Sequence, residues 1–258
     1  GESVRTPSVL VMPWSGTNYL VGQNKFRRLL REHILPRYDG ALPESLMAAS
    51  PHAVVPFEGT TEANMGAIIG NIAAHELTVD YFWIDAGWFT SPQKNWARGV
   101  GNFAPDPARF PNGMKPVAEA AHGAGMKFLL WFEPERVMTD TMLYTEHPDW
   151  LIAPPETFPA ELMYQFNDQF HLLDLGNPEA AGWLTETLSS AIRQIGIDCY
   201  RNDFNMYPSF YWATQDGPDR QGMAEIRYVE GFYRYLDTLR ARHPHLLLDN
   251  CASGGRRI

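Results

Sequence analysis

Hydrophobic residues along the chain gather in short runs that are separated by longer amphipathic stretches. The runs predict strands at residues 53–57, 79–84, 127–132, 171–175, 197–200 and 245–248. Apolar positions at helical spacing predict helices over residues 61–75, 114–124, 178–196 and 222–242. A proline-rich stretch at residues 138–170 is irregular and is expected to hold one short helix. Strand–helix repeats with nearly continuous apolar strands are typical of a parallel sheet covered by helices.

The first fifty residues do not follow this alternation. They predict a short strand at residues 8–12, a helix at 24–35 that Pro36 ends, and a linker at 43–51. We therefore divide the chain into a leader with a linker, residues 1–50, and an α/β domain, residues 51–258. Residues 1–6 resemble the interior of a longer polypeptide rather than a signal peptide.

Acidic residues mark the ends of the predicted strands. Those at or just beyond a C-terminal strand end are Glu58, Asp85, Glu133, Asp174, Asp203 and Asp249. In a (β/α)8 barrel these ends meet on one face, where such enzymes keep their active sites. We therefore predict an α/β fold of this type, a TIM barrel that is incomplete because about six β-α units are present. An open doubly wound sheet is the alternative, but no glycine-rich phosphate loop follows the first strand.

Composition narrows the possible partners. The formal net charge of −9 and the pI near 5.3 argue against nucleic acid and anionic membranes. Arg27, Arg28 and Arg31 cluster at helical spacing and suit a solvated helix edge. The two cysteines, Cys199 and Cys251, lie in apolar runs and are expected to be buried thiols. The eight histidines are scattered without metal-ligand spacing, so we expect neither metal nor cofactor.

Asp203 is the best candidate for a nucleophile. It follows a strongly apolar strand, and Arg201 two residues earlier is expected to share its face and keep it ionised. Two carboxylates can cleave a glycosidic bond by double displacement. The 8 Trp, 11 Tyr and 14 Phe residues also suit sugars, which stack on aromatic rings. A plain salt bridge between Arg201 and Asp203 is the alternative.

Five motifs occur in a characteristic order. They are WIDAGWF at residues 83–89, WFEPE at 131–135, HPDWL at 147–151, YRNDFN at 200–205 and CASGGRR at 251–257. With them the chain resembles glycoside hydrolase family 36, the α-galactosidase and α-N-acetylgalactosaminidase family. The similarity covers nearly the whole chain, including residues 24–28 of the leader.

The resemblance implies roles for individual residues. Asp203 matches the nucleophile, and Arg201 takes the place of a sugar-binding lysine. Asp85 matches the first of two adjacent aspartates that bind the galactose 4- and 6-hydroxyls. The other residues assigned to substrate binding are the pocket residues Trp88, Trp131 and Asn205, Cys251 and Gly254 of the loop near the sugar's C2, and Arg257 before the acid/base. Glu133, Glu135 and Asp249 could instead be rim carboxylates that orient their neighbours.

Three departures from the family pattern matter. Ala86 replaces the second pocket aspartate, and Arg201 is not an equivalent donor to lysine. The acid/base aspartate would fall just after Ile258, so we expect these residues to be part of a longer catalytic barrel and inactive alone.

The resemblance implies a retaining exo-acting α-glycosidase that removes terminal α-linked galactose without a cofactor. It also implies a homo-oligomer, often a tetramer in this family, with a β-sandwich ahead of the barrel. An α-N-acetylgalactosaminidase, another α-glycosidase and a non-catalytic carbohydrate-binding barrel remain alternatives. The compartment is left open, with the cytoplasm favoured over secretion.

Overall fold

The computed structural model describes residues 8–38, 40–43, 46–91, 95–157 and 169–254. The chain divides into two compact units, residues 1–45 and residues 46–258, each of which is described by itself. The boundary lies inside the predicted linker at residues 43–51.

The first unit is built around one helix. Helix α1 (Tyr19–Leu29) begins at Asn18, whose side chain accepts a hydrogen bond from the Leu20 N–H, and continues as a π-helical turn over Leu30–Ile34. Leu35 is extended, as expected for a residue before proline. The helix therefore begins five residues earlier than the predicted start at residue 24.

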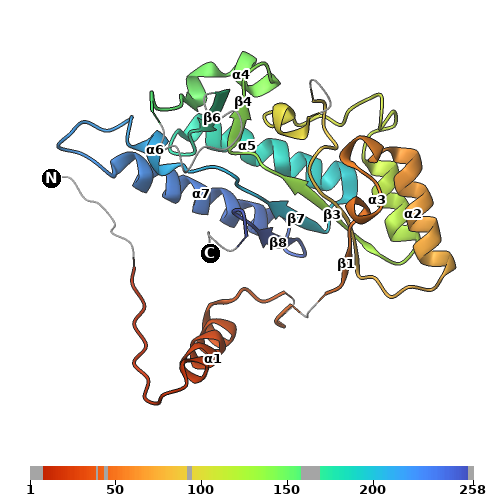
Figure 1. Ribbon diagram of the computed structural model, residues 1–258, viewed down its shortest axis with the longest axis horizontal. Coiled ribbons are helices and arrows are strands. Elements are labelled where there is room, and N and C mark those ends of the chain that lie inside the picture. The colour runs from red at the N-terminus through yellow and green to blue at the C-terminus, as the bar shows by residue number, and fades with distance from the viewer. Residues whose placement is uncertain (1–7, 39, 44–45, 92–94, 158–168, 255–258) are drawn as a thin grey trace. The chain divides into compact units, whose positions relative to one another are not determined.

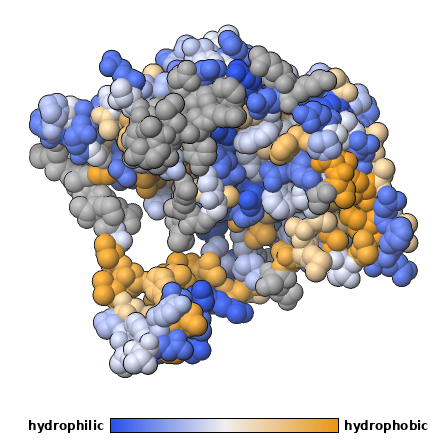
Figure 2. Space-filling view, viewed as in Figure 1, coloured by the Kyte–Doolittle hydropathy of each residue, from blue (hydrophilic) through white to orange (hydrophobic). Residues whose placement is uncertain are grey.

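The predicted strand at residues 8–12 is wrong. These residues form no strand, and Val9 and Val11 are 83% and 75% exposed. Figure 2 shows the apolar side chains of this unit at the surface. A β-branched run becomes a strand only where a second strand supplies backbone partners, and the described part of the unit offers none here.

The second unit contains a parallel sheet of five strands in the order β1-β2-β3-β7-β8. Their bounds are β1 Ala48–Ala49, β2 Tyr81–Ile84, β3 Lys127–Phe132, β7 Cys199–Asn202 and β8 Leu247–Asn250. The connecting helices are α2 Glu62–Ala74, α3 Lys115–Gly123, α5 Pro178–Ala191 and α7 Met223–Arg242. Figure 1 shows these helices alongside the strands that they connect, with α2 beside α3 and α5 beside α7. This is the β-α alternation of a barrel wall.

Alternation along the strands separates two buried layers. Phe82 and Phe128, in register on β2 and β3, belong to the large core that the helices cover. Tyr81, Leu129 and Cys199 form a separate small cluster with the partly buried Trp83 and Leu247. Successive side chains of a strand point to opposite faces, so this second cluster belongs to the inner face of the sheet.

The helix starts agree with their sequence signals. Thr61 caps α2 by accepting a hydrogen bond from the Asn64 N–H, and Asn177 caps α5 ahead of Pro178. Helix α5 continues as a π-helical turn over Ile192–Gly196. Because both faces of the sheet are covered, every residue of β3 after Lys127 is buried.

The predicted strand at residues 53–57 is wrong. Short 3-10 helices occupy Pro51–Ala53 and Phe57–Gly59, and the first strand lies earlier, at Ala48–Ala49, where it pairs with β2. Proline lacks the N–H that a central strand needs, and Pro51 and Pro56 interrupt the apolar run. Glu58 therefore lies in a 3-10 turn rather than at a strand end.

The predicted strand at residues 171–175 exists but belongs elsewhere. Strand β6 (Phe170–Leu173) lies between β4 (Arg136–Met138) and β5 (Leu151–Ile152) in an antiparallel three-stranded sheet. Among the described residues the barrel sheet thus has five parallel strands rather than six, and Asp174 is not at its edge. The short helix expected within residues 138–170 is α4 (Met142–Glu146), and a second short helix, α6 (Ser209–Trp212), precedes α7. Figure 1 shows α4, β4 and β6 together, away from β8.

Candidate active site

A cavity of about 540 Å³ opens at the C-terminal ends of β2, β3 and β7. Its lining residues come from these strand ends and the loops beyond them, and they are Phe57, Asp85, Ala86, Asn95, Trp96, Ala97, Trp131, Arg136, Asp203 and Asn205. Carboxylate, amide, guanidinium and aromatic groups thus share one space. Four residues assigned to the site from the sequence, Asp85, Trp131, Asp203 and Asn205, are brought together here.

Asp203 follows β7 directly and is held from several sides. Its N–H donates to the Phe132 carbonyl at 2.8 Å, which extends the β3–β7 ladder by one residue. Its Oδ2 accepts hydrogen bonds from Trp131 Nε1 at 3.1 Å and Asn205 Nδ2 at 2.9 Å, and its Oδ1 accepts the Phe204 N–H at 2.7 Å. Burial acts to raise the pKa of Asp203, but these donors and the Cys251 thiol outweigh it and hold that pKa below its usual value. Asp203 is therefore a buried carboxylate that stays ionised.

Arg201 forms its ion pair with Asp249 rather than with Asp203. Its guanidinium pairs with Asp249, the residue opposite it in the β7–β8 register, and lies 4.8 Å from the centre of the Trp83 ring. Burial acts to lower the pKa of Arg201, but the Asp249 carboxylate outweighs it, and the Asp203 carboxylate also acts to raise this pKa. Nε of Arg201 is buried and has no hydrogen-bond partner among the described residues. Arg201 and Asp249 are not among the residues that line the cavity.

Asp85 and the two tryptophans assigned to the site occupy different depths. Asp85 follows β2, and its Oδ1 accepts the Ala86 N–H at 2.7 Å. Trp131 lines the cavity, whereas Trp88 is 1% exposed and donates its indole N–H to the Trp131 carbonyl at 2.8 Å. Trp88 also lies edge-on to Phe132. Trp88 therefore supports the wall from behind and is not among the cavity's lining residues.

The loop after β8 reaches Asp203 through a thiol. The Cys251 N–H donates to the Asn202 carbonyl at 2.8 Å, which places Sγ next to the carboxylate. Burial raises the pKa of the Cys251 thiol, so the thiol stays protonated and can donate to Asp203. Gly254 donates its N–H to Cys251 Sγ at 3.4 Å and has a φ of 100°, which favours glycine. Arg257 lies outside the described residues. The expectation of buried free thiols is confirmed for Cys199 and Cys251.

Glu133 and Arg136 form a buried ion pair beside the nucleophile candidate. Arg136 donates to Glu133 Oε2 at 2.6 Å, and Glu133 Oε1 accepts the Asn205 N–H. Burial raises the pKa of Glu133, and the guanidinium of Arg136 opposes that shift. Both carboxylate oxygens accept hydrogen bonds, which is the pattern of an ionised group. Glu133 thus orients Asn205, as expected for a rim carboxylate.

The family model of melibiase matches residues 3–258. The chain belongs to the melibiase family. It is 34% identical over 186 residues to α-galactosidase 2 of Pediococcus pentosaceus, and this alignment covers 72% of this chain and 25% of that relative. It is 30% identical over 266 residues to an α-galactosidase of Escherichia coli, which covers 100% of this chain and 35% of that relative. This melibiase chain therefore spans about a third or less of the length of these relatives.

A solved structure of the same family has a similar fold. A variant of the glycoside hydrolase family 36 α-galactosidase AgaA from Geobacillus stearothermophilus, in complex with stachyose, aligns with a TM-score of 0.75 and 26% identity. The alignment covers 90% of this chain and 31% of that chain. The predicted family and the predicted incomplete (β/α)8 barrel are confirmed.

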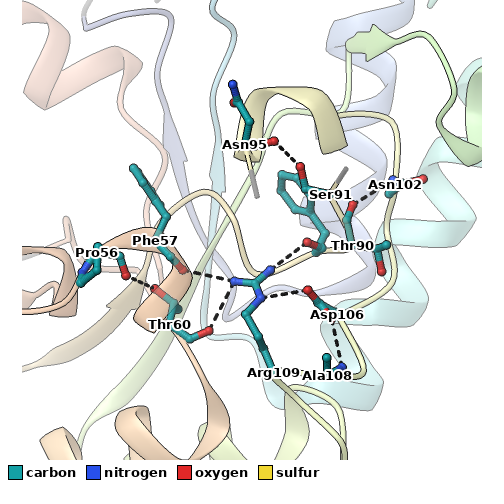
Figure 3. Close-up of polar contacts among 11 residues, drawn as sticks. Pro56, Phe57, Thr60, Thr90, Ser91, Asn95, Asn102, Asp106, Ala108 and Arg109 are labelled. Carbon is teal, nitrogen blue, oxygen red and sulfur yellow. Dashed lines mark hydrogen bonds and ion pairs between the residues drawn. The ribbon is translucent and has the colours of Figure 1, made fainter. Parts of the chain in front are cut away.

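An arginine network fixes the loop of this melibiase chain that carries Asp85. Arg109 pairs with Asp106 at 2.9 Å and donates to the carbonyls of Phe57 at 3.2 Å and Phe89 at 3.0 Å. Figure 3 shows its guanidinium between Asp106, Phe57 and Thr60. The network joins the loop after β2 to the turn that contains Phe57, a lining residue of the cavity. A second cavity of about 270 Å³ next to this network shares Phe57 and Trp96 with the first.

Sequence reasoning missed the lining residues that loops contribute. Asn95, Trp96 and Arg136 lie outside the predicted strand ends, and Phe57 lies at the end of a predicted strand that the structure does not contain. The only sequence signal was Arg136 itself, a cation directly after the WFEPE motif. Among the described residues, no group of three or more His, Cys, Asp or Glu side chains is placed to hold a metal ion. None of the described helices has both the length and the apolarity to cross a membrane.

Proposed function

We propose that the protein containing this chain is a retaining, exo-acting α-galactosidase that removes terminal α-linked galactose from oligosaccharides. The observation that supports it best is Asp203, a buried carboxylate kept ionised by several donors at the edge of a cavity of about 540 Å³. The α-galactosidase relatives, and the stachyose complex of AgaA, support galactosides as the substrate class. Asp85, Trp131 and Asn205 are proposed to bind the sugar or to orient the nucleophile.

The proposed reaction has two displacements. Asp203 attacks C1 of the galactosyl residue, the bond from C1 to the glycosidic oxygen breaks, and an acid donates a proton to that oxygen. The glycosyl ester on Asp203 is then attacked at C1 by water, which loses a proton to the same acid/base group. Asp203 leaves as a carboxylate, and galactose leaves with its α configuration. The acid/base is expected at the position that follows Ile258 in the longer chain.

Hydrolysis of an aryl α-galactoside and of stachyose by the full-length protein tests the proposal. We expect NMR to detect α-galactose as the first product, and Asp203→Asn to lower kcat by several orders of magnitude. Asp237→Asn is the matched control, because it changes an exposed carboxylate on α7 that does not line the cavity. First release of β-galactose would exclude double displacement. Full activity of Asp203→Asn would exclude this nucleophile.

Ala86 favours a second candidate, an α-N-acetylgalactosaminidase or a related α-glycosidase with a different glycon. Ala86 lines the cavity beside Asp85 but offers no acceptor for a sugar hydroxyl. A hydrogen bond to a charged group contributes about 1.5–3 kcal/mol. Ala86→Asp should therefore raise kcat/KM for an aryl α-galactoside relative to the α-N-acetylgalactosaminide. An unchanged ratio would show that residue 86 does not set glycon preference.

Two further proposals concern the whole protein. The resemblance supports a homo-oligomer, which light scattering of the full-length protein can test. It also supports assigning residues 1–50 to a leader and linker after a β-sandwich domain, with residues 51–258 in the barrel. Limited proteolysis should then cleave near the linker at residues 43–51 before it cleaves the barrel.

A further inference from the structure

Arg136 is an unassigned residue that lines the cavity of Asp203 and Asp85. It is the first residue of β4, three positions after Glu133, and is 4% exposed. It is the only cation among the described residues that line this cavity. Desolvating a guanidinium is costly unless its charge and its N–H groups find partners. The environment of Arg136 therefore needs an explanation.

The charge of Arg136 is compensated by Glu133, but one of its buried donors has no hydrogen-bond partner among the described residues. Glu133 accepts one hydrogen bond from the guanidinium at 2.6 Å. The Arg136 Cζ lies 4.4 Å from the centre of the Phe170 ring and 5.4 Å from that of Trp96. Rings attract the cation but accept no conventional hydrogen bonds from its edge. Nε of Arg136 is buried and has no hydrogen-bond partner among the described residues.

The surroundings of Arg136 lead directly to Asp203. Trp96 lines the cavity and lies edge-on to Trp131 with 5.7 Å between ring centroids, and Trp131 donates to Asp203. Glu133, which binds Arg136 with one oxygen, accepts the Asn205 N–H with the other. Arg136 is thus held between the aromatic wall and the group that orients Asn205. Its guanidinium is rigid before any ligand arrives, which lowers the entropic cost of binding.

We propose that Arg136 is a substrate-binding, specificity-determining residue that donates hydrogen bonds to a hydroxyl oxygen of the sugar bound against Asp203. A sugar hydroxyl both donates and accepts, whereas the carboxylates of Asp85 and Asp203 only accept. Arg136 supplies the complementary charged donor in the same cavity. The inference rests on the proposed function only in taking the ligand to be a sugar.

This role predicts which glycons the cavity prefers. Ala86 offers no acceptor at its position on the wall, while Arg136 offers donors. The hydroxyl that contacts Arg136 therefore acts as an acceptor. Replacing it by fluorine, which accepts weakly but cannot donate, should be tolerated better than replacing it by hydrogen. Contact with a carboxylate would give the opposite preference, because neither analogue can donate a proton and the partial negative charge of fluorine is repelled by the carboxylate.

The test measures binding of methyl α-galactoside and its 2-, 3-, 4- and 6-deoxy and deoxyfluoro analogues by calorimetry. The full-length protein carries Asp203→Asn, so that turnover does not interfere. We expect one deoxy analogue to bind roughly ten- to a hundredfold more weakly, as for loss of a hydrogen bond to a charged group, and its fluoro analogue to recover part of that loss. We call the loss of affinity caused by removing one hydroxyl the penalty at that position. Adding Arg136→Met should abolish the penalty at the one affected position and leave the other penalties unchanged.

Arg242→Met is the matched control, because it breaks another Arg–Glu ion pair, that with Glu186 at the surface. It should leave every penalty unchanged. Arg136→Lys, which keeps the charge but loses the planar fork, should keep part of the penalty. The fluoro series needs no change at Arg136 and is informative even if Arg136→Met does not fold.

The outcomes separate this inference from the proposed function. The role of Arg136 would be overturned if each deoxy analogue lost the same affinity with and without Arg136. It would also be overturned if no fluoro analogue bound more tightly than the matching deoxy analogue. Hydrolysis of an aryl α-galactoside by the protein with Asp203 intact would then still support the proposed function. Conversely, Arg136-dependent sugar binding without any hydrolysis would support Arg136 and refute the glycosidase. Loss of all sugar binding in the protein would refute both.

Discussion

The amide of Asn205 provides a direct test of how Asp203 is kept ionised. Nδ2 of Asn205 donates to Asp203 Oδ2 at 2.9 Å, and Ser253 Oγ donates to Asn205 Oδ1 at 2.7 Å. Ser253 thereby fixes which end of the amide faces the carboxylate. Asn205→Ala removes this donor and keeps the backbone N–H that Glu133 accepts. We expect the pKa of Asp203 to rise, because fewer donors then oppose the effect of burial.

The size of the effect follows from the remaining contacts. A hydrogen bond to a charged group contributes about 1.5–3 kcal/mol, and we expect the lower end because Trp131 and the Phe204 N–H keep their bonds. A loss of about 1.4 kcal/mol in the stabilisation of the ionised form corresponds to roughly tenfold tighter binding of the proton to Asp203. The native pKa of Asp203 is lowered, so its ionised form is lost as pH falls through that value. A higher pKa moves this loss to higher pH, and the stability that the ionised group contributes is lost over the same range.

The assay is the pH dependence of kcat/KM for an aryl α-galactoside with a good leaving group. Such a substrate needs little acid assistance, so the acidic limb reports the nucleophile. The acidic limb should move to higher pH in Asn205→Ala. It should stay in place in the control Asn64→Ala, because Asn64 is exposed on α2 and its side chain donates to the Gly59 carbonyl. A rate that falls equally at all pH values would refute the reasoning. It would instead support the assignment of Asn205 as a residue that binds the sugar.

Two further predictions concern stability and the extent of the chain. Gly231→Ala on α7 should lower the melting temperature of the full-length protein, because the new Cβ would lie 1.8 Å from the Leu175 carbonyl oxygen. The control is Gly70→Ala on α2, where a new Cβ meets nothing within 4 Å and the change should be neutral or stabilising. Thermal unfolding followed by circular dichroism checks both, and equal effects would contradict the close packing of α7 on Leu175. The 258 residues expressed alone should show no hydrolysis of an aryl α-galactoside and should aggregate in size-exclusion chromatography, because β1 and β8 are edge strands of the five-stranded sheet. A soluble, active 258-residue chain would refute this prediction.

The strands could be predicted where the local pattern alone decides them. Strand β3 has the predicted bounds, because an apolar run between Gly125 and Glu133 leaves no other choice. Strands β7 and β8 begin two residues later than predicted, since apolar content does not fix a register. That shift places Asp249 inside β8, opposite Arg201.

The assignment of a strand to a sheet could not be read locally. Residues 170–173 are as apolar as any barrel strand, yet their partners are β4 and β5. Pairing depends on which other segments reach the same place, and a run of hydrophobic residues does not contain that information. The same limit explains the missed strand at Ala48–Ala49, which is too short and too small to stand out.

The candidate site divides along the same line. Asp85 and Asp203 could be predicted because a carboxylate directly after an apolar strand is conspicuous, and parallel strands bring such positions to one edge. The partner of Asp203 could not be predicted, because β7 ends at Asn202 and the alternation that would align Arg201 with Asp203 ends with it.

The acceptors of the cavity come from the ends of the barrel strands, and its charged donor comes from the antiparallel sheet. Arg136 reaches the cavity through β4, a strand of the other sheet, so its position depends on how β4 pairs with β6. Sequence periodicity within one element carries no information on that pairing. A search for carboxylates at strand ends can therefore find candidates for the nucleophile. It does not find candidates for the residues that determine sugar specificity. Arg136 and Trp96 line the cavity together with the carboxylates, and we expect the specificity of the site to depend on them.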